Sequence, residues 1–362
     1  MTRDGARRIE IVEPTLEDFS GHCFGLVASL CQALAGRPAR VWAGKNSVLL
    51  KFGEGVRVEP VFSRRWRLPQ SYFLYRRLLR DAGPLVITTA RSNDLRLLDF
   101  AAAGTIAPGK ACLYFHWVRD TADKRRFMQR MAAKQPNLVI LGTTPTIVEF
   151  FHTCGFRNAI HQPYPMILQR GQAEEGGTAR HLLYAGAARQ DKGFGRMVDL
   201  VELLAARGET LAVKVQVSAD HYGKYDRATA QDIERLEKIA YPGLGILRET
   251  QTPQAYAEMF RGGICIQAYD REDFRDRVSG VTLDALARGC PIVATSGTWI
   301  SRLVGQYGAG ISVEEPAAES LYRAAKAILE NYAEFRRNAL AAGAAEAGRS
   351  WTPQLERLGS AS

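Results

Sequence analysis

Residues 263–299 read GICIQAYDREDFRDRVSGVTLDALARGCPIVATSGTW, and this stretch decides the fold class that we predict for the whole chain. It contains an apolar run typical of a buried parallel strand, then a charged loop, an apolar helix and a second apolar run. In order, these segments lie at 264–268, 270–277, 280–288 and 291–295. Ser279 is a favoured residue at a helix start, and Gly289 is typical of a helix end. The pattern predicts a strand–loop–helix–strand unit of an α/β protein.

The start of the predicted helix is a candidate anion site. The first amides of a helix have no acceptor within the helix, and the helix dipole is positive there, so this end can hold a phosphate. Ser279 is suited to cap these amides, and Gly280 lets a ligand approach the backbone. Asp284 lies about one turn further on, where a carboxylate can accept hydrogen bonds from sugar hydroxyls, and Asp276 precedes it on the loop side. The alternative is that Asp284 pairs with Arg288 on a solvated helix face.

This stretch resembles the nucleotide-sugar site of retaining glycosyltransferases of the GT-B fold, in the large family 4 group. The family pattern is an acid, seven residues, a second acid and then Ala-x-Ala-x-Gly-x-Pro-Val-Val-Ala-Thr. Here Asp276, Asp284 and the sequence ALARGCPIVAT at 285–295 stand in those places, and both acids are Asp where the family usually has Glu. The family's Gly-Phe-Gly is replaced by Arg-Val-Ser-Gly at 277–280.

The resemblance implies an α/β protein with the GT-B fold, in which two Rossmann-like doubly wound domains face each other across a cleft. It also implies which residues of this stretch bind the donor. Asp276 or Arg277 would contact the donor sugar, and Asp284 would hold the nucleotide ribose. The other donor-binding residues that we expect here are Ser279, Gly280 and Val281.

Length and composition favour a soluble protein of two domains. The chain has 362 residues, which is long for one core, and its 46% hydrophobic and 24% charged residues are typical of globular proteins. It has no run of about 18 apolar residues, and residues 1–14 lack the apolar segment of a secretory signal. The six cysteines show no CxxC pair or metal-site spacing, so we expect free, mostly buried thiols. These features predict a cytoplasmic location.

Apolar runs alternate with helical segments in both halves, which predicts parallel sheets covered by helices on both faces. The expected strands lie at 8–12, 39–43, 56–62, 85–88, 112–116, 137–141, 181–185, 211–217, 244–247, 263–268, 290–295 and 310–313. The expected helices lie at 21–34, 72–79, 122–133, 193–206, 227–239, 253–260, 280–288, 298–305 and 317–342, and two more begin near 93 and 144.

A stretch rich in Pro, Gly and charged residues separates the two halves and is typical of a linker. We predict four parts: an N-terminal acceptor-side domain, a linker, a C-terminal nucleotide-sugar-binding domain, and a tail that is a candidate helix packing back on the first domain. Their boundaries are 1–165, 166–178, 179–345 and 346–362.

A second candidate phosphate site follows the strand at 181–185. Gly186 ends that strand, and Arg189 and Lys192 stand three residues apart before a helix, where two cations and helix amides can neutralise a diphosphate. The family carries Gly, Arg and Lys-Gly at this position, so the resemblance implies that Arg189 and Lys192 bind the donor diphosphate. The alternative is a pair of solvated cations in a loop.

The resemblance implies three further site residues in the first half. His116 ends an expected strand, and the carboxyl ends of strands in open α/β sheets face the ligand crevice. The family often has a histidine here that contacts the donor sugar near the reacting carbon; the alternative is a core histidine bonded to a backbone carbonyl. Gly21 and His22 begin the first helix, where a glycine-bearing loop of the family helps to position acceptor or phosphate.

A metal site is not expected. Asp270, Glu272 and Asp273 lie close together in one loop, but their spacing is not that of a calcium-binding loop, and the chain has no Asp-x-Asp. GT-B enzymes generally work without a bound metal, so the resemblance implies no metal and no cofactor beyond the nucleoside-diphosphate sugar.

Positive charge is concentrated in the first half of the chain. Residues 1–170 hold 25 Lys and Arg against 13 Asp and Glu, whereas residues 171–362 hold 23 against 25. The basic clusters are Arg64-Arg65-Trp66-Arg67, Arg76-Arg77 with Arg80, and Lys124-Arg125-Arg126 with Arg130. Basic residues next to aromatic ones suit an anionic membrane surface. They also suit nucleic acid, but no nucleic-acid-binding module is visible, so we favour the membrane over nucleic acid and over an ordinary solvated surface.

The function implied by the resemblance is retaining transfer of a hexose from a nucleoside-diphosphate sugar to a hydroxyl of a glycan or lipid-linked saccharide. The catalytic residues that we expect are His116, Arg189, Lys192 and Asp276. Two alternatives remain open. A sugar-nucleotide epimerase on the same fold would release a changed sugar nucleotide without any acceptor, and a non-catalytic scaffold that binds glycan or membrane would not turn over a donor.

Overall fold

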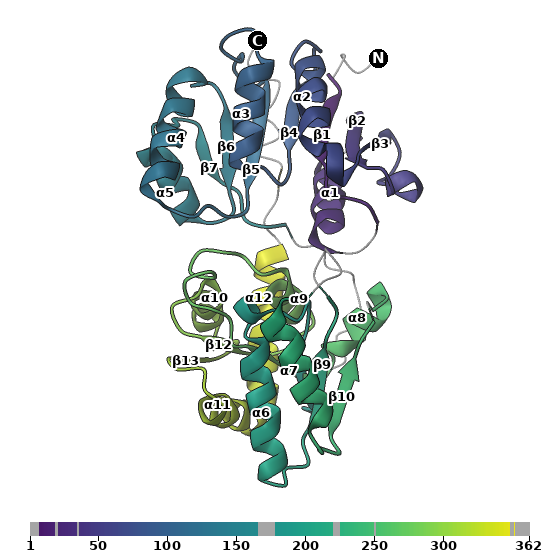
Figure 1. Ribbon diagram of the computed structural model, residues 1–362, viewed down its shortest axis with the longest axis vertical. Coiled ribbons are helices and arrows are strands. Elements are labelled where there is room, and N and C mark those ends of the chain that lie inside the picture. The colour runs from purple at the N-terminus through teal and green to yellow at the C-terminus, as the bar shows by residue number, and fades with distance from the viewer. Residues whose placement is uncertain are drawn as a thin grey trace. The chain divides into compact units, whose positions relative to one another are not determined.

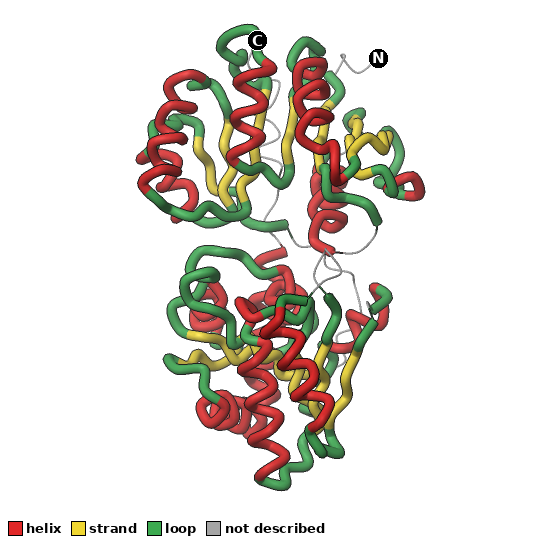
Figure 2. The backbone as a smooth tube through the Cα atoms, viewed as in Figure 1, coloured by secondary structure: helices red, strands yellow, loops and turns green. Residues whose placement is uncertain are grey.

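The computed structural model describes residues 7–18, 21–34, 36–165, 178–219, 225–249, 251–347 and Trp351. The chain divides into two compact units, one of residues 1–167 with 349–362 and the other of residues 168–348. The predicted linker at 166–178 lies outside the described residues apart from Thr178. In each unit the strands form one layer that has helices packed against it (Figure 1, Figure 2).

Among the described residues, the first unit has seven strands: β1 (Ile9–Glu13), β2 (Ala39–Gly44), β3 (Val56–Phe62), β4 (Leu85–Ile87), β5 (Ala111–Phe115), β6 (Val139–Gly142) and β7 (Ala159–His161). They form one parallel sheet in the order β3-β2-β1-β4-β5-β6-β7. Ile11 at the centre is in register with Val41 of β2 and Val86 of β4. The helical segments are α1 (Gly21–Ala33), η1 (Ser47–Leu49), η2 (Arg64–Trp66), α2 (Arg67–Leu78), α3 (Ser92–Ala101), α4 (Ala122–Lys134) and α5 (Pro145–Thr153).

The two faces of this sheet are buried against different helices. Successive residues of a strand point to opposite faces, so Ile9 and Ile11 lie in a cluster with α1, whereas Val12 lies in a cluster with α2, α3, α4 and α5. Trp351, from the predicted C-terminal tail, belongs to the α1 cluster, and its ring contacts Tyr114 at 5.1 Å between centroids. The rest of the tail beyond residue 347 lies outside the described residues.

Among its described residues, the second unit has six strands: β8 (His181–Tyr184), β9 (Ala212–Gln216), β10 (Leu244–Leu247), β11 (Gly263–Gln267), β12 (Ile292–Thr295) and β13 (Gly310–Val313). They form a parallel sheet in the order β10-β9-β8-β11-β12-β13. The helical segments are η3 (Gln190–Lys192), α6 (Phe194–Ala206), α7 (Arg227–Lys238), α8 (Pro253–Met259), α9 (Gly280–Ala287), α10 (Trp299–Tyr307), α11 (Ala318–Glu330) and α12 (Tyr332–Ala347). One core cluster joins this sheet to α6 and α11, and α9 packs against α12.

The predicted pair of doubly wound α/β domains is confirmed, and most predicted elements are present within one or two residues. Three differ. The helix expected at 72–79 already begins at Arg67, because Pro69 lies in its first turn, where a missing N–H is tolerated. The helix expected at 317–342 is two helices separated at Asn331, and the short edge strand β7 was not predicted. All six cysteines are free and buried, as predicted.

Strand order reverses once in each sheet, between β1 and β4 in the first unit and between β8 and β11 in the second. In open parallel sheets, ligands bind beyond the carboxyl ends of the strands at such a point. The loops that follow these four strands are therefore where we look for a site. No helix within the described residues has the length and apolar character that crossing a membrane requires.

Candidate functional site

In the second unit, the loops after β8 and β11 lie side by side and are fastened by backbone hydrogen bonds. The amide of Asp270 donates to the carbonyl of Asp191 at 2.9 Å. Arg196 of α6 reaches across and donates from Nη1 to the carbonyl of Ala268 at 2.7 Å. The two loops therefore form one continuous surface beyond the carboxyl ends of β8 and β11, where the strand order reverses.

Gly193 is required where these loops meet. It starts α6 with a left-handed backbone (φ +69°), and a Cβ at this position would lie 2.1 Å from the carbonyl oxygen of Ala268. Gly186, at the end of β8, has a φ of +94°, and a Cβ there would lie 3.2 Å from Lys192 Nζ and 3.1 Å from Val281 of α9. Two glycines thus let the η3 turn, the β11 loop and the start of α9 approach one another closely.

Three cations lie near one carboxylate on this loop surface. Arg189 Nε donates to Asp191 Oδ1 at 2.8 Å, and its Nη2 bonds the other carboxylate oxygen. Arg277, which is 86 residues further along the chain, places its Nη1 3.4 Å from Asp191 Oδ2. The third cation is Lys192, whose Nζ lies 6.0 Å from the centre of the Tyr269 ring; this ammonium group forms no hydrogen bond or ion pair within the described part of the chain.

The crowding changes how these groups titrate. Burial, followed by the charges of Arg189 and Arg277, lowers the pKa of Lys192 from its ordinary 10.5 to about 8. Burial and the charge of Arg189 also lower the pKa of Arg277. The charged forms of Lys192 and Arg277 are therefore disfavoured in the folded protein without a ligand, which is the arrangement expected of an anion site.

The start of α9 adds backbone amides next to this cluster. Ser279 caps the helix by accepting from the amide of Thr282 at 3.4 Å, and the hydroxyl of Thr282 donates to Oε1 of the buried Gln267 at 2.7 Å. The space at Gly280 is open, because a Cβ built there would meet no atom within 4 Å. A ligand can thus reach the first amides of α9, as predicted for a phosphate site.

Asp284 has both the partner that the alternative interpretation predicted and one that was not predicted. Arg288 Nη1 lies 3.3 Å from Asp284 Oδ1, as expected for a pair four residues apart on a helix. Tyr256 of α8 donates its hydroxyl to Oδ2 at 3.2 Å. The Asp284 side chain is still 41% exposed, so its oxygens can be reached from solvent. Its partial burial raises the pKa of this carboxyl group.

Asp276 and Arg277 point to different neighbours. Asp276 accepts a hydrogen bond from Arg302 of α10 at 2.9 Å, and its side chain is 22% exposed. Arg277 stacks on Phe274 with 4.8 Å between the guanidinium carbon and the ring centre, in addition to its pairing with Asp191. Arg277 is thus the residue of this pair that joins the cation cluster.

His116 follows the end of β5 in the first unit and has the bond that its alternative interpretation predicted. Its Nε2 donates to the carbonyl of Thr88 at 2.8 Å, and its ring packs on Tyr114 and Tyr164. Unlike a core histidine, it is partly exposed. The backbone of Gly21 and His22 begins α1, as predicted, and the His22 side chain is not described.

A buried carboxylate that was not predicted holds the turn to which His116 is bonded. Glu13, at the end of β1, accepts hydrogen bonds from the Thr88 hydroxyl at 2.7 Å and the Thr89 hydroxyl at 3.0 Å. It also accepts from the amide of Thr15 at 3.1 Å and from the hydroxyl of the same residue. An acid directly after the predicted strand at 8–12 was the available signal, since such a residue lies at the ligand edge of the sheet.

The other residues missed from the sequence are Asp191, Gln267 and Tyr256, which hold Arg189, Thr282 and Asp284 in place. The position of Asp191 two residues after Arg189 was a visible signal. The loop acids Asp270, Glu272 and Asp273 do not converge, and the described residues contain no group of three His, Cys, Asp or Glu side chains arranged to hold a metal ion.

Comparison with known proteins identifies the fold. No protein-family model and no curated protein matches the sequence. Sucrose-phosphate synthase from Thermosynechococcus elongatus matches the structure with a TM-score of 0.71 and 12% identity, over 97% of this chain and 98% of that one. HepE from Anabaena, in complex with UDP and glucose, matches with a TM-score of 0.65 and 15% identity, over 97% and 99%. An alpha,alpha-trehalose-phosphate synthase (UDP-forming) from Burkholderia vietnamiensis matches with a TM-score of 0.70 and 12% identity, over 99% and 98%. At these identities the likeness establishes the fold, and the predicted GT-B fold is confirmed.

Proposed function

We propose that this protein is a retaining glycosyltransferase that moves a hexose from a nucleoside-diphosphate sugar to a hydroxyl group. The observation that carries the proposal is the cluster of Arg189, Lys192 and Arg277 around the carboxylate of Asp191, at the strand-order reversal of the second unit. The pKa of Lys192 is lowered by burial and then by the two arginines, so an incoming dianion stabilises its ammonium group by supplying negative charge.

In the proposed reaction, the cation cluster and the first amides of α9 hold the donor diphosphate. Charge grows on the leaving phosphate as the bond to the sugar breaks, and preoriented donors stabilise that charge. Asp191 fixes the guanidinium group of Arg189 through two hydrogen bonds, so little reorganisation is needed during the step. These cations supply the positive charge that a metal ion supplies in other enzymes, and the proposal therefore includes no metal and no further cofactor.

The remaining roles follow the resemblance to family 4. Asp284 would bind the ribose, Arg277 or Asp276 would contact the donor sugar, and His116 would orient the sugar near the reacting carbon. The helix start at Gly21 and His22 would position the acceptor or phosphate. With no carboxylate assigned as a nucleophile, retention would follow a front-face course in which the leaving phosphate helps to deprotonate the acceptor hydroxyl.

The partners that we propose are a nucleotide-sugar donor and a glycan or lipid-linked saccharide acceptor. The donor is supported by HepE, which was solved in complex with UDP-glucose, and by the UDP-forming trehalose-phosphate synthase. The acceptor rests on the family resemblance. We further propose a cytoplasmic location with peripheral attachment to an anionic membrane surface, which the excess of positive charge in residues 1–170 supports.

Product analysis separates this function from its two alternatives. Each of a panel of nucleotide sugars is incubated with the protein, with and without saccharide acceptors, and the products are separated by mass and by anomeric configuration. A transferase releases nucleoside diphosphate and an elongated acceptor that keeps the anomeric configuration of the donor. An isomerised sugar nucleotide formed without acceptor would instead indicate the epimerase, and binding without turnover would indicate the scaffold.

A further inference from the structure

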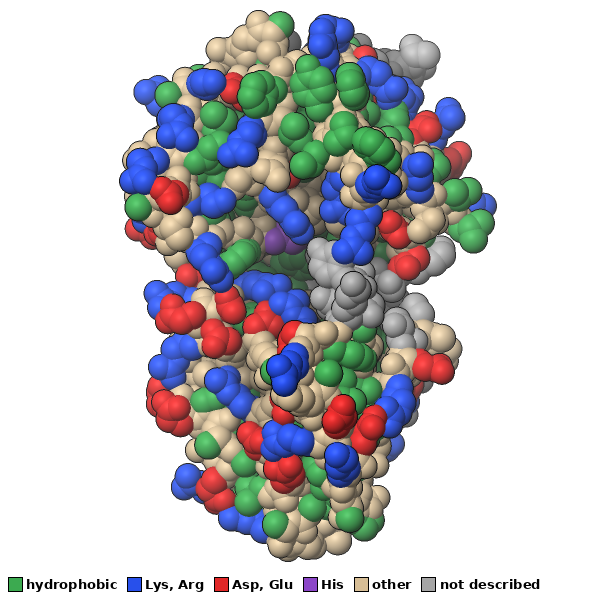
Figure 3. Space-filling view, in the orientation of Figure 1, with side chains coloured by type: hydrophobic (Ala, Val, Ile, Leu, Met, Phe, Trp, Pro, Cys, Tyr) green, Lys and Arg blue, Asp and Glu red, His purple; other side chains and the backbone are tan. Residues whose placement is uncertain are grey.

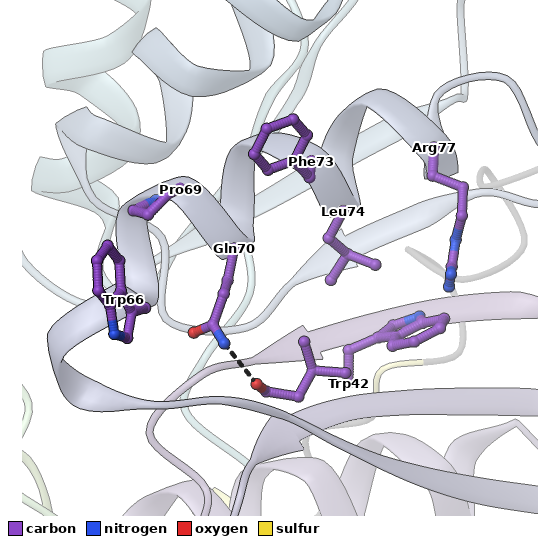
Figure 4. A pocket seen from close by; sticks show the side chains of 8 residues that line it. Trp42, Trp66, Pro69, Gln70, Phe73, Leu74 and Arg77 are labelled. Carbon is purple, nitrogen blue, oxygen red and sulfur yellow. Dashed lines mark hydrogen bonds between the residues drawn. The ribbon is translucent and has the colours of Figure 1, made fainter.

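A hollow of about 580 Å³ lies in the first unit between α2 and the strands β2 and β3. Its walls are aromatic and aliphatic, with one cation and one amide (Figure 4). The lining residues are Trp42, Val61, Trp66, Pro69, Gln70, Phe73, Leu74 and Arg77. Both ends of the amide are bonded within the protein, since Gln70 donates to the carbonyl of Val61 and accepts from the amide of Ser63, both at 2.9 Å. The hollow therefore offers an apolar surface with a positive end.

The rim of this hollow exposes large apolar side chains. Trp66 is 58% exposed, Leu68 52% and Phe73 67%. Val48 and Leu49, in the η1 segment that packs beside β3, are 69% and 80% exposed. Five of the eight large apolar side chains found exposed among the described residues thus lie between positions 48 and 73. Apolar patches of this kind on a folded surface mark an interaction site.

Most of the cations around the hollow lack a carboxylate partner within the described part of the chain. Among the described residues, no carboxylate pairs with Arg65, Arg67, Arg76, Arg77 or Arg80. Arg77 instead stacks on Trp42, with 4.4 Å between the guanidinium carbon and the ring centre. Basic and apolar side chains gather over α2 in the space-filling view (Figure 3).

The basic cluster of α4 is different. Arg125 pairs with Asp120, and Arg126 pairs with Asp123. In the α4 cluster two of the four cations are thus paired with carboxylates, whereas no such pair is found among the described residues for Arg65, Arg67, Arg76, Arg77 and Arg80. Of these two basic regions, the α2 region is the one that also exposes Trp66 and Phe73.

We propose that the α2 hollow and its rim are the surface by which this protein seats on an anionic lipid bilayer. Trp66, Leu68 and Phe73 would enter the headgroup region, where aromatic rings are favoured, and the arginines would contact lipid phosphates. This proposal assigns a surface to the membrane attachment proposed above, and it does not depend on the donor chemistry.

The charge of the patch argues for lipid over a second copy of the chain. A symmetric dimer through this face would bring two sets of unneutralised arginines together in a low-dielectric contact, where like charges repel most strongly. A bilayer with anionic headgroups instead supplies the missing negative charge and an apolar layer at the same time.

The test uses the full chain and vesicles of phosphatidylcholine, with or without 30% phosphatidylglycerol. Binding is measured by sedimentation at low and high salt and by quenching of tryptophan fluorescence with brominated lipid. Two variants address the patch, Trp66→Ser with Phe73→Ser and Arg76→Gln with Arg80→Gln. Their matched controls are Trp117→Ser, at another exposed tryptophan of the same unit, and Arg126→Gln with Arg130→Gln on α4.

We expect binding that needs phosphatidylglycerol and weakens at high salt. Each arginine near an anionic surface contributes about fivefold, so the α2 double variant should bind on the order of thirtyfold more weakly, and the α4 control should change far less. Bromolipid quenching should be lost in the Trp66 variant and kept in the Trp117 variant.

Equal binding to neutral vesicles, or equal losses for the α2 and α4 variants, would overturn the proposal. So would a wild-type dimer that Trp66→Ser with Phe73→Ser converts to monomer, since the patch would then join two copies. Nucleotide affinity of the same variants, measured by thermal shift, should stay at the wild-type value. A loss of membrane binding with unchanged nucleotide affinity can therefore be told apart from a defect in the proposed donor site.

Discussion

Replacing Lys192 with methionine removes one positive charge from the cation cluster and keeps the length and most of the apolar volume of the side chain. The change should act in opposite directions on folding and on ligand binding. In the folded protein the ammonium is surrounded by Arg189 and Arg277 and has no acceptor among the described residues, so its charge destabilises the fold. With a diphosphate bound, the same charge becomes favourable.

The magnitude follows from the lowered pKa. A fall from 10.5 to about 8 means that the charged form is disfavoured in the folded protein, and each pKa unit corresponds to about 1.4 kcal/mol. The side chain is partly exposed, so solvent screening reduces the effect, and we expect Lys192→Met to raise the free energy of unfolding at pH 7 by about 1–3 kcal/mol. The variant loses one charge-assisted contact to the ligand, so its affinity for a nucleoside diphosphate should fall by roughly 1.5–3 kcal/mol, which is tenfold or more.

The pH dependence has a definite sign. Because the unfolded chain keeps the proton up to about pH 10.5 and the folded protein loses it near pH 8, wild-type stability should rise between these values. Nucleotide affinity should fall over the same range as the ammonium deprotonates. Both dependences should be weaker in Lys192→Met.

Urea unfolding and calorimetric titration of a nucleoside diphosphate, each at pH 7 and pH 9, measure these quantities. Lys326→Met is the control, because Lys326 Nζ also lies 6.0 Å from a tyrosine ring in the same unit but is exposed on α11. A Lys192→Met protein that is less stable than wild type, or that binds nucleotide as well as wild type, would refute this reasoning.

Three further changes test the site. Gly193→Ala should lower the free energy of unfolding by at least about 3 kcal/mol, because its Cβ would overlap the Ala268 carbonyl oxygen, whereas Gly208→Ala, with a similar φ of +63° and no atom within 4 Å, should cost only about 1 kcal/mol in the same urea titration. Asp284→Asn should melt within about 0.5 kcal/mol of wild type yet bind donor at least about tenfold more weakly; a normal donor titration would leave only the Arg288 pair to explain this residue. Asp191→Asn should cost about 1–2 kcal/mol of stability and move the pH at which nucleotide affinity declines below 8, since the Asp191 charge raises the pKa of Lys192; an unchanged pH profile would count against the cluster.

The frame of the fold was predictable because local signals agreed with one another. The helix at 280–287 has a serine cap, an apolar interior and a glycine after its end, and β10 and β13 have the predicted bounds. Features set by tertiary packing were not predictable. The break at Asn331 interrupts an otherwise continuous helical pattern, and the edge strand β7, which pairs with β6, was not predicted.

The candidate site shows the same division. Arg189 and Lys192 were found from their spacing after a strand, and the structure places them together with Arg277. The contact between Asp191 and Arg277 joins residues 86 positions apart, and no local pattern reveals it. The pairing of Asp276 with Arg302 is also non-local. It places this acid beside α10, whereas the spacing in the sequence had suggested that Asp276 acts together with Asp284.

Thermal-shift titration of the wild type, Lys192→Met and Lys326→Met with a panel of nucleoside-diphosphate sugars tests the central claim most directly. The account predicts that at least one donor stabilises the wild type, by about 2.7 kcal/mol at a hundredfold excess over Kd, and that Lys326→Met responds equally. At the same ligand concentration, Lys192→Met should lose at least about half of this stabilisation, because its Kd is at least about tenfold higher. A wild type that no nucleotide sugar stabilises, or a Lys192→Met protein that is stabilised as much as the wild type, would contradict the assignment of this cluster as the donor site.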